Sequence, residues 1–569
     1  MTASSDDAQP PGSAQPSGTA ELSGKGAPSG DTAPSGDAGL NEFGYDNKLK
    51  RTLGSFHTFA AGISYISVLT GTFQMSYLGI SSGGPAYWWS WPMVFLGQLM
   101  VALSFAELAS HYPIAGSIYN WAKKLGGQHV AWLAGWMMLI ASIVSIAATA
   151  LAYQKTLPQI WGAFQIVGDG SSPTDDAANG VLLASALILF TTLVNAFGVK
   201  LMARINSTGV LVELIAAVLL ILFLAVAATR GPEVVLDTQG TGSDYSGGYL
   251  GAFLVAALAS SYVMYGFDTA SSLGEESLHP HRDAPRAILR SLIASFVLGG
   301  LIILLALMAA RNLQAPELGE VGLQFVLTDA LGPLIGRMFL VVVFVAITVC
   351  VLAVHTAAIR MAFAMARDNS LPGGSKLARV SPRFRTPVVP AVVIGVLAVA
   401  LLAVNIGQPQ IFSAVTSLAI ILIYVSYLLV TIPMLVARLR GTWSSAKRAG
   451  RFSLGKFGLP VNVLAVLWGL GMATNLAWPR QEVYNAEPPY HWYLQWSSVL
   501  FVGAVALGGF AYYWFVQRHR IGVLDEHRAA AASDVDGIGA SDVDEPGASD
   551  VDDESSAAPE ADPAVSREV

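Results

Sequence analysis

Long apolar stretches dominate the pattern of hydrophobic and polar positions along this chain. Twelve of them approach the roughly 20 residues that a helix needs to cross a bilayer, with short polar segments between them. The pattern predicts an all-α polytopic membrane protein with 12 transmembrane helices, and an even number of crossings places both termini on one side. The predicted spans are residues 54–80, 85–110, 130–157, 180–199, 205–229, 249–275, 286–310, 333–366, 388–405, 409–437, 458–478 and 494–517.

The composition agrees with this fold class and excludes several functions. Hydrophobic residues make up 53% of the 569 residues and charged residues only 12%, whereas soluble domains contain about 25% charged residues. The single cysteine, Cys350, permits neither a disulfide within the chain nor a cysteine-based zinc site. We expect no metal, no cofactor and no nucleic-acid partner.

Two polar tails flank the predicted transmembrane domain, residues 48–520. Residues 1–47 consist largely of Ser, Gly, Ala, Pro and Asp and are predicted to be a disordered cytoplasmic tail, because such a composition cannot bury a core. Residues 521–569 are predicted to be a disordered acidic tail, in which the unit ASDVD occurs three times at a spacing of eight residues. These aspartates lack the ligand spacing of an EF-hand loop, so a solvated tail is expected rather than a calcium site.

The distribution of basic residues predicts the orientation. If the amino terminus is cytoplasmic, 25 of the 32 Lys and Arg residues fall on the inside and 5 on the outside. Lys and Arg are enriched in cytoplasmic loops, so we expect both termini to be cytoplasmic. We expect the membrane to be the plasma membrane. A single miscounted span would scramble the asymmetry, which therefore favours twelve spans.

The sixth predicted span, residues 249–275, contains an interruption at Gly266 and Asp268. Glycine costs about 1 kcal/mol in a helix interior, and an aspartate at mid-membrane costs about 3 kcal/mol unless it is paired. Transporters hold substrates and ions at helices interrupted near the bilayer midplane. The alternative is that Asp268 simply pairs with a neighbouring helix. Beyond the span, Glu275 and Glu276 are expected to meet water.

The first predicted span carries a similar group of small and polar residues, at the depth at which Gly266 interrupts span six. Paired interruptions of this kind indicate a transport site between inverted repeats. The repeats would cover about 50–230 and 248–437, followed by two extra helices within about 458–517. The alternative is that these residues only allow close helix packing. They are Ser67, Thr70, Gly71 and Thr72.

Four motifs occur in order along the chain, at residues 67–71 (SVLTG), 106–121 (AELASHYPIAGSIYNW), 265–276 (YGFDTASSLGEE, with APR at 284–286) and 365–372 (MARDNSLP). Together they resemble the amino acid–polyamine–organocation permeases, most closely the branch of amino acid, GABA and choline permeases. The resemblance implies a LeuT-like five-plus-five inverted repeat with two extra helices, alternating access, and transport of amino acids or small amines. Asn369 and Tyr265 depart from the usual Gly and Ser or Thr, and the bulkier Tyr265 leaves the substrate open.

An interrupted first span would leave backbone groups free for an anion. After Gly71, unpaired N–H groups and the positive end of the helix dipole suit a substrate carboxylate. Ser67, Thr70 and Thr72 lie beside this point, and the threonine hydroxyls can add hydrogen bonds. We therefore assign these four residues to substrate binding.

The interrupted sixth span would instead suit a cation. Carbonyl groups freed near Gly266 and Phe267 can accept hydrogen bonds from an ammonium. Tyr262 and Tyr265 either cover that ammonium by cation–π contact, at about 0.5–2 kcal/mol, or serve as ordinary aromatic packing.

Three further residues are candidates for ion coupling or gating. Asp268 can bind the substrate amine, order the break or carry a proton, and the family resemblance favours the latter two roles. Glu213 is the only ionisable residue within span five after Arg204, and a buried carboxylate can be neutral in one conformation and charged in the other; the alternative is a structural pair with Arg204 or a hydroxyl. Thr356 either joins an ion site or bonds to its own backbone. Arg360 is expected to reach cytoplasmic water.

These features predict a secondary active transporter of amino acids or amino-acid-like amines, with polyamine, choline or GABA as alternative substrates. The chain contains no Gly-x-x-x-x-Gly-Lys-Ser/Thr motif for nucleotide binding, so a proton or sodium gradient, or exchange, would supply the energy. A channel, a receptor or a membrane enzyme on the same scaffold is the alternative class. An enzyme would need clustered metal ligands or a folded soluble domain, and the sequence predicts neither.

Overall fold

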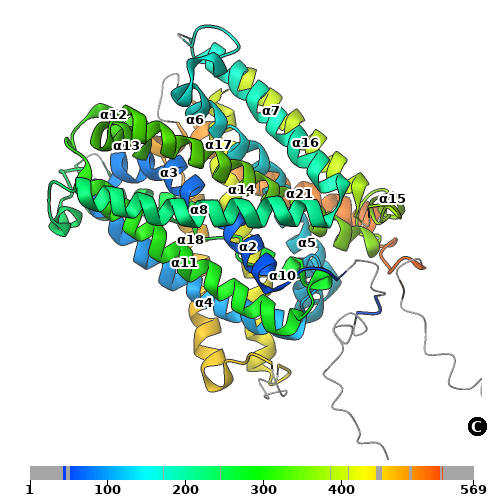
Figure 1. The fold of residues 1–569 in the computed structure, drawn as a ribbon. Coiled ribbons are helices and arrows are strands. Elements are labelled where there is room, and N and C mark those ends of the chain that lie inside the picture. Colours follow the sequence, from blue (N-terminus) through cyan, green and yellow to red (C-terminus); the bar gives the residue numbers. More distant parts are fainter. Residues whose placement is uncertain are drawn as a thin grey trace, which may run out of the picture.

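The computed structural model describes residues 43–45, 51–170, 172–243, 245–384, 386–407, 409–443, 451–485, 490–525 and 528. Within these residues the regular elements are all helical, and the only β-type contacts are two isolated bridges (Figure 1). Nearly all of the two predicted disordered tails, namely residues 1–42, 46–47, 526–527 and 529–569, lies outside the described residues.

Helices occupy all of the predicted spans. The long ones are α4 (Ser90–His111), α5 (Ser117–Ala150), α7 (Pro173–Phe197), α8 (Val199–Ala227), α11 (Pro280–Ala309), α14 (Pro333–Arg367), α16 (Val388–Gly407), α17 (Pro409–Leu439), α18 (Gly458–Ala477) and α21 (Ser497–Tyr512). The first span is split into α2 (Ser55–Ile66) and α3 (Val68–Gly83), and the sixth into α9 (Tyr249–Val263) and α10 (Thr269–Ser272). Short connecting helices include α6 (Ala152–Ile160), α12 (Pro316–Glu320), α13 (Leu323–Leu331), α15 (Gly374–Leu377), α19 (Gln481–Tyr484) and α20 (Trp492–Gln495).

Among the described residues, nine helical segments are long and apolar enough to cross a membrane, and two shorter helices are also apolar. The chain is therefore a multi-pass membrane protein. The exact count of twelve crossings and the inverted repeat stay predictions. The third span begins earlier than predicted, because α5 starts at Ser117 and bends at Gly127, whose φ of 79° lies in the left-handed region.

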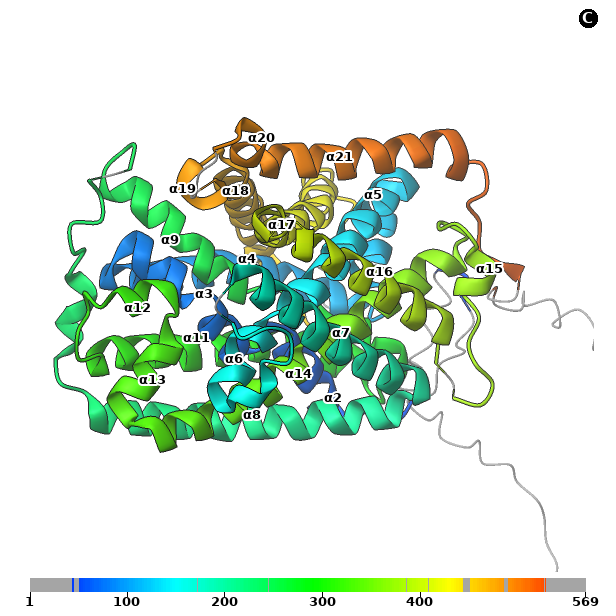
Figure 2. The ribbon, with the colours of Figure 1, turned by 90° about the horizontal axis from the view of Figure 1, so that it is seen from above.

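The helices form a bundle in which α5, α14 and α17 are central and α8 and α21 lie on opposite outer faces (Figure 2). Helix α8 is an outer helix, since its apolar residues Leu211, Ile215 and Leu222 are about half exposed. Apolar side chains directed outward suit lipid rather than water. In contrast, residues 349–367 of α14 are all buried. No apolar–polar alternation in the sequence marks this stretch.

The two described ends of the chain lie on one side of the bundle, which we call the tail side. The N–H groups of Gly522 and Leu524 donate to the carbonyls of Asp368 and Arg367 at the end of α14, at 3.0 and 2.9 Å. Tyr45 forms an isolated antiparallel bridge with Arg528. The ends are thus on the same side, as an even number of spans requires; the assignment of that side to the cytoplasm stays a prediction.

Close packing of α4 against α11 depends on a glycine. A Cβ atom at Gly299 would lie 2.2 Å from Cζ2 of Trp91, a fully buried residue whose indole N–H donates to the Phe296 carbonyl at 2.9 Å. The indole cannot move aside without losing this bond, so the helices must separate to admit even one methyl group.

We therefore expect Gly299→Ala to destabilise the protein by about 1–3 kcal/mol, the usual cost of overpacking a core. The matched control is Gly471→Ala in α18, where no atom lies within 4 Å of the added Cβ. Thermal unfolding of the purified protein should show a lower melting temperature for Gly299→Ala than for Gly471→Ala; equal values would contradict this account of the α4–α11 contact.

Candidate functional site

The first span breaks at Ser67, three residues before the Thr70–Gly71 position that the sequence favours. Ser67 has a φ of 38° and separates α2 from α3. Gly71 lies inside α3, where its N–H donates to the Ser67 carbonyl at 2.9 Å. The glycine is needed for another reason: a Cβ atom there would lie 2.8 Å from Cγ2 of Val263. The prediction of a break was correct, but its position was wrong by about one turn.

The sixth span breaks where the sequence predicts. Helix α9 ends at Val263, Gly266 has a φ of 85°, and α10 begins at Thr269. A Cβ atom at Gly266 would lie 1.9 Å from Cδ1 of Tyr65, so both the backbone conformation and the space require glycine.

The two breaks face each other. Helix α3 packs along α9 and α2 packs along α10, so the broken spans run antiparallel with their interruptions at one level. On the tail side the N–H groups of Thr52 and Leu53 both donate to the Glu276 carbonyl, at 2.9 and 3.0 Å. The beginning of one broken span is thereby joined to the end of the other through main-chain atoms.

Three tyrosines fill the space between the breaks. The rings of Tyr65 and Tyr265 are 6.0 Å apart and those of Tyr262 and Tyr265 are 6.1 Å apart, both edge-to-face. All three are largely buried. Tyr65 was not singled out in the sequence, because a single tyrosine two residues before Ser67 carries no pattern that predicts its contact with Tyr265 across 200 residues.

Glu213 of α8 closes the first break. Its Oε1 accepts the Ser67 hydroxyl at 3.0 Å and the Leu69 N–H at 3.2 Å, and Glu213 is only 4% exposed. The Ser67 hydroxyl also lies 2.6 Å from that of Thr70. A carboxylate from another helix therefore caps the first turn of α3, where free N–H groups and the helix dipole favour an anion. Of the two structural partners considered for Glu213, Arg204 and a hydroxyl, the structure shows a hydroxyl, that of Ser67.

Asp268 and Tyr427 close the second break. The Tyr427 hydroxyl, from α17, donates to Asp268 Oδ1 at 2.5 Å and accepts the Gly266 N–H at 2.9 Å. Because the Gly266 N–H bonds outside the helix, the Tyr262 carbonyl four residues earlier does not receive its helical hydrogen bond. Tyr427 was not predicted: a single tyrosine in an apolar span carries no pattern from which its partner can be inferred.

Three predicted residues lie apart from these contacts. The Thr72 hydroxyl donates to the Val68 carbonyl of its own helix at 2.6 Å. Phe267 packs against Phe105 and Tyr427, with ring centroids 6.1 and 5.6 Å away. Thr356 donates to the Leu352 carbonyl at 2.7 Å and lies 2.8 Å from Oδ1 of Asn195 in α7. The structure therefore joins Ser67, Thr70, Glu213 and Asp268 to the breaks and gives Thr72, Phe267 and Thr356 local contacts.

Buried ion pairs close the tail side below the breaks. Glu276 pairs with Arg360 at 2.8 Å and Glu275 with Arg367 at 2.9 Å, and all four side chains are at most 3% exposed. The expectations that Glu275 and Glu276 meet water, and that Arg360 reaches it, were wrong. The sequence places these residues at the ends of spans, but α14 and the segment after α10 meet there and exclude solvent. Arg438 similarly pairs with the buried Glu107.

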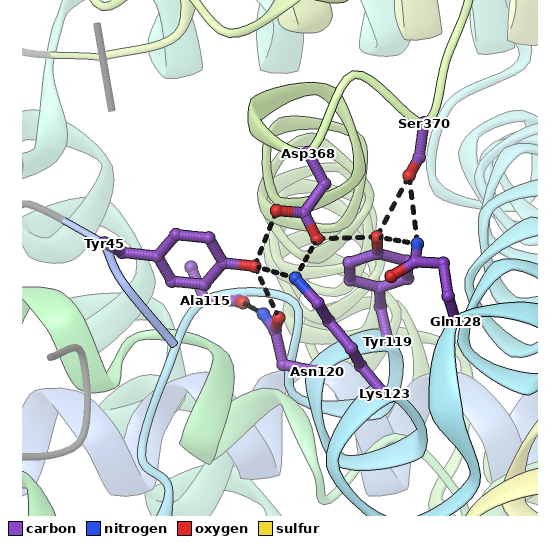
Figure 3. Close-up of polar contacts among 8 residues, drawn as sticks. All are labelled: Tyr45, Ala115, Tyr119, Asn120, Lys123, Gln128, Asp368 and Ser370. Carbon is purple, nitrogen blue, oxygen red and sulfur yellow. Dashed lines mark hydrogen bonds and ion pairs between the residues drawn. The ribbon is translucent and has the colours of Figure 1, made fainter. Parts of the chain in front are cut away.

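A second cluster at the tail side gathers around Asp368, just after α14 (Figure 3). Asp368 receives Lys123 Nζ at 2.5 Å and the hydroxyls of Tyr119 and Tyr45 at 2.8 and 2.9 Å. The Arg367 guanidinium lies 3.7 Å from the Tyr45 ring centroid. Burial, together with nearby Asp368, raises the pKa of Tyr45 well above its ordinary value, so its phenol stays protonated and donates. The cluster therefore ties the amino-terminal segment to α5 and α14.

Little open space lies beside the first break. A cavity of about 10 Å³ lies between α3 and α9 beside Gly71 and Thr72, which is room for about one water molecule. A larger hollow of about 590 Å³ near α18 and α19 is lined by none of the break residues. Within the described part of the chain, no group of three or more His, Cys, Asp or Glu residues is placed to hold a metal ion.

Comparison with known proteins matches residues 53–505 to the family model described as amino acid permease. The chain is 26% identical over 501 residues to the amino-acid permease BAT1 of Arabidopsis thaliana, covering 84% of this chain and 94% of the relative. It is 28% identical to the methylthioribose transporter of Bacillus subtilis, covering 66% and 81% of the two chains. It is 27% identical to the branched-chain amino acid permease BcaP of the same species, covering 60% and 72%.

The second break yields a stability prediction. Tyr427→Phe removes the hydroxyl donor to the buried Asp268 carboxyl and leaves the buried Gly266 N–H without its acceptor. We expect a loss of about 1–3 kcal/mol, the usual penalty for a buried unsatisfied group. The matched control is Tyr87→Phe, which removes a buried hydroxyl that has no hydrogen-bond partner among the described residues. The melting temperature should fall for Tyr427→Phe alone; an equal fall in both variants would show that loss of any buried hydroxyl suffices.

Proposed function

The chain belongs to the amino acid permease family, and on that premise we propose that it is a secondary active transporter of amino acids or amino-acid-like amines. The substrate binds between the two helix breaks and crosses the plasma membrane by alternating access. The observation that carries this proposal is the antiparallel pairing of two interrupted spans whose freed backbone groups face one another. Such paired interruptions hold substrates in secondary transporters.

The two sides of the site suit the two charges of an amino acid. The N-terminal turn of α3 offers N–H groups and the positive end of a helix dipole to a carboxylate. Across from it, the Tyr262 carbonyl is free to accept from an ammonium, and the rings of Tyr65, Tyr262 and Tyr265 favour a cation over their faces.

Glu213 is the proposed coupling residue. Its carboxylate already bonds to the first turn of α3, so a substrate carboxylate would meet a like charge at the same helix end. Protonation of Glu213 removes this conflict. We therefore assign proton coupling to Glu213 rather than to Thr356, whose hydroxyl is engaged with Leu352 and Asn195.

The same contact favours a second candidate substrate. If Glu213 stays charged throughout, it serves as a permanent cap of α3, and the site accepts a cation without a carboxylate, such as a polyamine or choline. The carbonyls and tyrosines of the second break would then supply the recognition.

The buried pairs at the tail side form the proposed inner gate. In this proposal the tail side is cytoplasmic, twelve spans are arranged as a five-plus-five repeat with two extra helices, and the Asp368 cluster and the Glu275 and Glu276 pairs separate when the site opens inward. Breaking a buried pair costs several kcal/mol unless water or substrate replaces the contacts, which suits a gate that stays shut without substrate.

Uptake into proteoliposomes tests the function. The purified protein would be offered labelled amino acids, GABA, polyamines and choline, with proton and sodium gradients imposed separately. Saturable uptake and counterflow are expected for amino acids when the proton gradient is directed inward. Saturable uptake of cations alone would establish the second candidate, and flux without saturation or counterflow would indicate a channel.

Glu213→Gln should separate coupling from binding. Glutamine keeps an acceptor oxygen for the Leu69 N–H but mimics the protonated state, so the variant should exchange substrate at zero gradient and fail to concentrate it under a proton gradient. Glu233→Gln, at an exposed position, is the matched control and should behave as the parent. If Glu213→Gln concentrates substrate as well as the parent, coupling does not run through Glu213, and Asp268 becomes the next residue to test.

Asp368→Asn should weaken the inner gate. Loss of the buried partner of Lys123 costs the closed state about 3–5 kcal/mol, so the tail side should open more often. Cys350, the only cysteine in the sequence and buried beside the Tyr65 carbonyl, reports this opening through its rate of labelling by a hydrophilic maleimide.

Labelling from the tail side should be at least about tenfold faster in Asp368→Asn, and labelling from the opposite side should be unchanged. Asp525→Asn serves as the control, because its pair with Arg528 is exposed and contributes little. Faster labelling from both sides would indicate unfolding instead of opening, and parental rates from both sides would remove the cluster from the gate.

A further inference from the structure

An apolar groove lies on the outer face of the bundle, away from the breaks. It has a volume of about 730 Å³ and is formed by α6, α7, α8 and α14, a size within the 300–1,000 Å³ typical of small-molecule sites. Its walls are almost entirely hydrocarbon, for example Leu187 and Phe190 of α7, Val212 of α8 and Phe344 of α14. The charged residue among those lining it is Arg204.

Arg204 lies at one end of the groove, close to the start of α8. Eight residues separate it from Val212, which corresponds to about 12 Å along the helix. One leaflet of a bilayer has a hydrocarbon depth of about 15 Å, half of the roughly 30 Å core. Along α8 the groove thus covers about the depth of one leaflet, starting near the tail-side end of the helix, and it continues beyond α8 to Tyr153 and Leu157 of α6.

Further cations surround this end of the groove. Lys200 is one turn before Arg204 on α8, and both side chains are exposed. The loop before α16, which carries the exposed Arg383, lies against the α7–α8 turn: the Phe197 and Phe384 rings are 5.8 Å apart, and the Thr386 hydroxyl donates to the Ala196 carbonyl at 3.2 Å.

The two segments that meet here, residues 194–206 and 377–384, form what we call the basic corner. They contain Lys200, Arg204, Arg379 and Arg383 and neither Asp nor Glu. Neither Lys200 nor Arg204 forms an ion pair with a described residue. Clusters of four or more Lys and Arg at a membrane surface bind anionic lipid headgroups, at about 1 kcal/mol for each charge.

We propose that this groove is a binding site for an anionic phospholipid of the tail-side leaflet. The phosphate lies among Lys200, Arg204 and Arg383, and an acyl chain enters the groove between α7, α8 and α14. The basic corner and the apolar groove are adjacent, and Arg204 belongs to both. A soluble anion would bind only at the basic corner, and a neutral lipid would bind only in the groove. The proposal requires no particular substrate or coupling ion.

The position of the groove gives the lipid a structural role. A Cβ atom at Gly209 would lie 2.1 Å from Cγ2 of Val349, so α8 and α14 touch closely at the groove floor, and Val212 in its wall precedes Glu213. A bound acyl chain would support this contact from the membrane side and hold α8 where Glu213 reaches the first break.

Native mass spectrometry of the full-length protein in detergent tests the site. Phosphatidylglycerol and phosphatidylcholine with identical acyl chains would be titrated separately, and the parent should bind one phosphatidylglycerol more tightly than the others. In Lys200→Gln/Arg204→Gln that affinity should fall about 25-fold, about fivefold for each charge, whereas phosphatidylcholine binding should not change. Arg440→Gln, an exposed cation at the end of α17, should leave both affinities unchanged.

A second pair of variants tests the groove itself. Ala186→Trp, which fills the groove, should abolish the tight phosphatidylglycerol site, whereas Leu222→Trp on a lipid-facing position outside it should not. An equal loss of phosphatidylglycerol affinity in Arg440→Gln and in Lys200→Gln/Arg204→Gln would overturn the proposal. The lipid would then be attracted by surface charge in general and not by this site. Binding that survives Ala186→Trp and is displaced by inorganic phosphate would also overturn it, since the corner would then be a surface anion site. Each outcome is independent of whether the protein transports amino acids.

Discussion

Two helices interrupted inside an apolar bundle impose the central constraint on this structure. Water cannot satisfy the N–H and C=O groups that a break releases in the hydrocarbon region, so protein groups must do so. Glu213 meets the N–H groups at the first break, and Asp268 with Tyr427 meets those at the second. Each break therefore recruits a partner from a distant part of the chain, and α8 and α17 are fixed in place by the same bonds that close the site.

The constraint extends to the tail side. The segment that follows the second break carries Glu275 and Glu276, which are buried and so require cations. Arg360 and Arg367 of α14 supply them, and Asp368 just beyond collects Lys123 and Tyr45. The ion pairs and the Asp368 cluster thus tie the segment after the second break, the end of α14 and the amino-terminal segment together on the tail side.

The sequence predicted the elements of this fold better than their partners. Apolar runs of bilayer length mark spans because composition alone requires it, and Gly266 beside Asp268 marks a break because both are costly in a helix. The break at Ser67 was placed a turn too late, since Gly71, which lies there for close packing with Val263, has the same local signature as a break. Tyr427, Tyr65 and the burial of Arg360 depend on contacts across more than 80 residues, which no local pattern records.

The main-chain bonds from Thr52 and Leu53 to the Glu276 carbonyl have a consequence for how the molecule can evolve and move. Side-chain substitution cannot remove them, apart from the introduction of proline, so the link between the two broken spans tolerates sequence drift that would abolish an ion pair. Helices α2 and α10 are consequently fastened as a single mechanical body. In the proposed alternating-access cycle, opening towards the tail side would then move this body as a unit against α5 and α14, which pack against it.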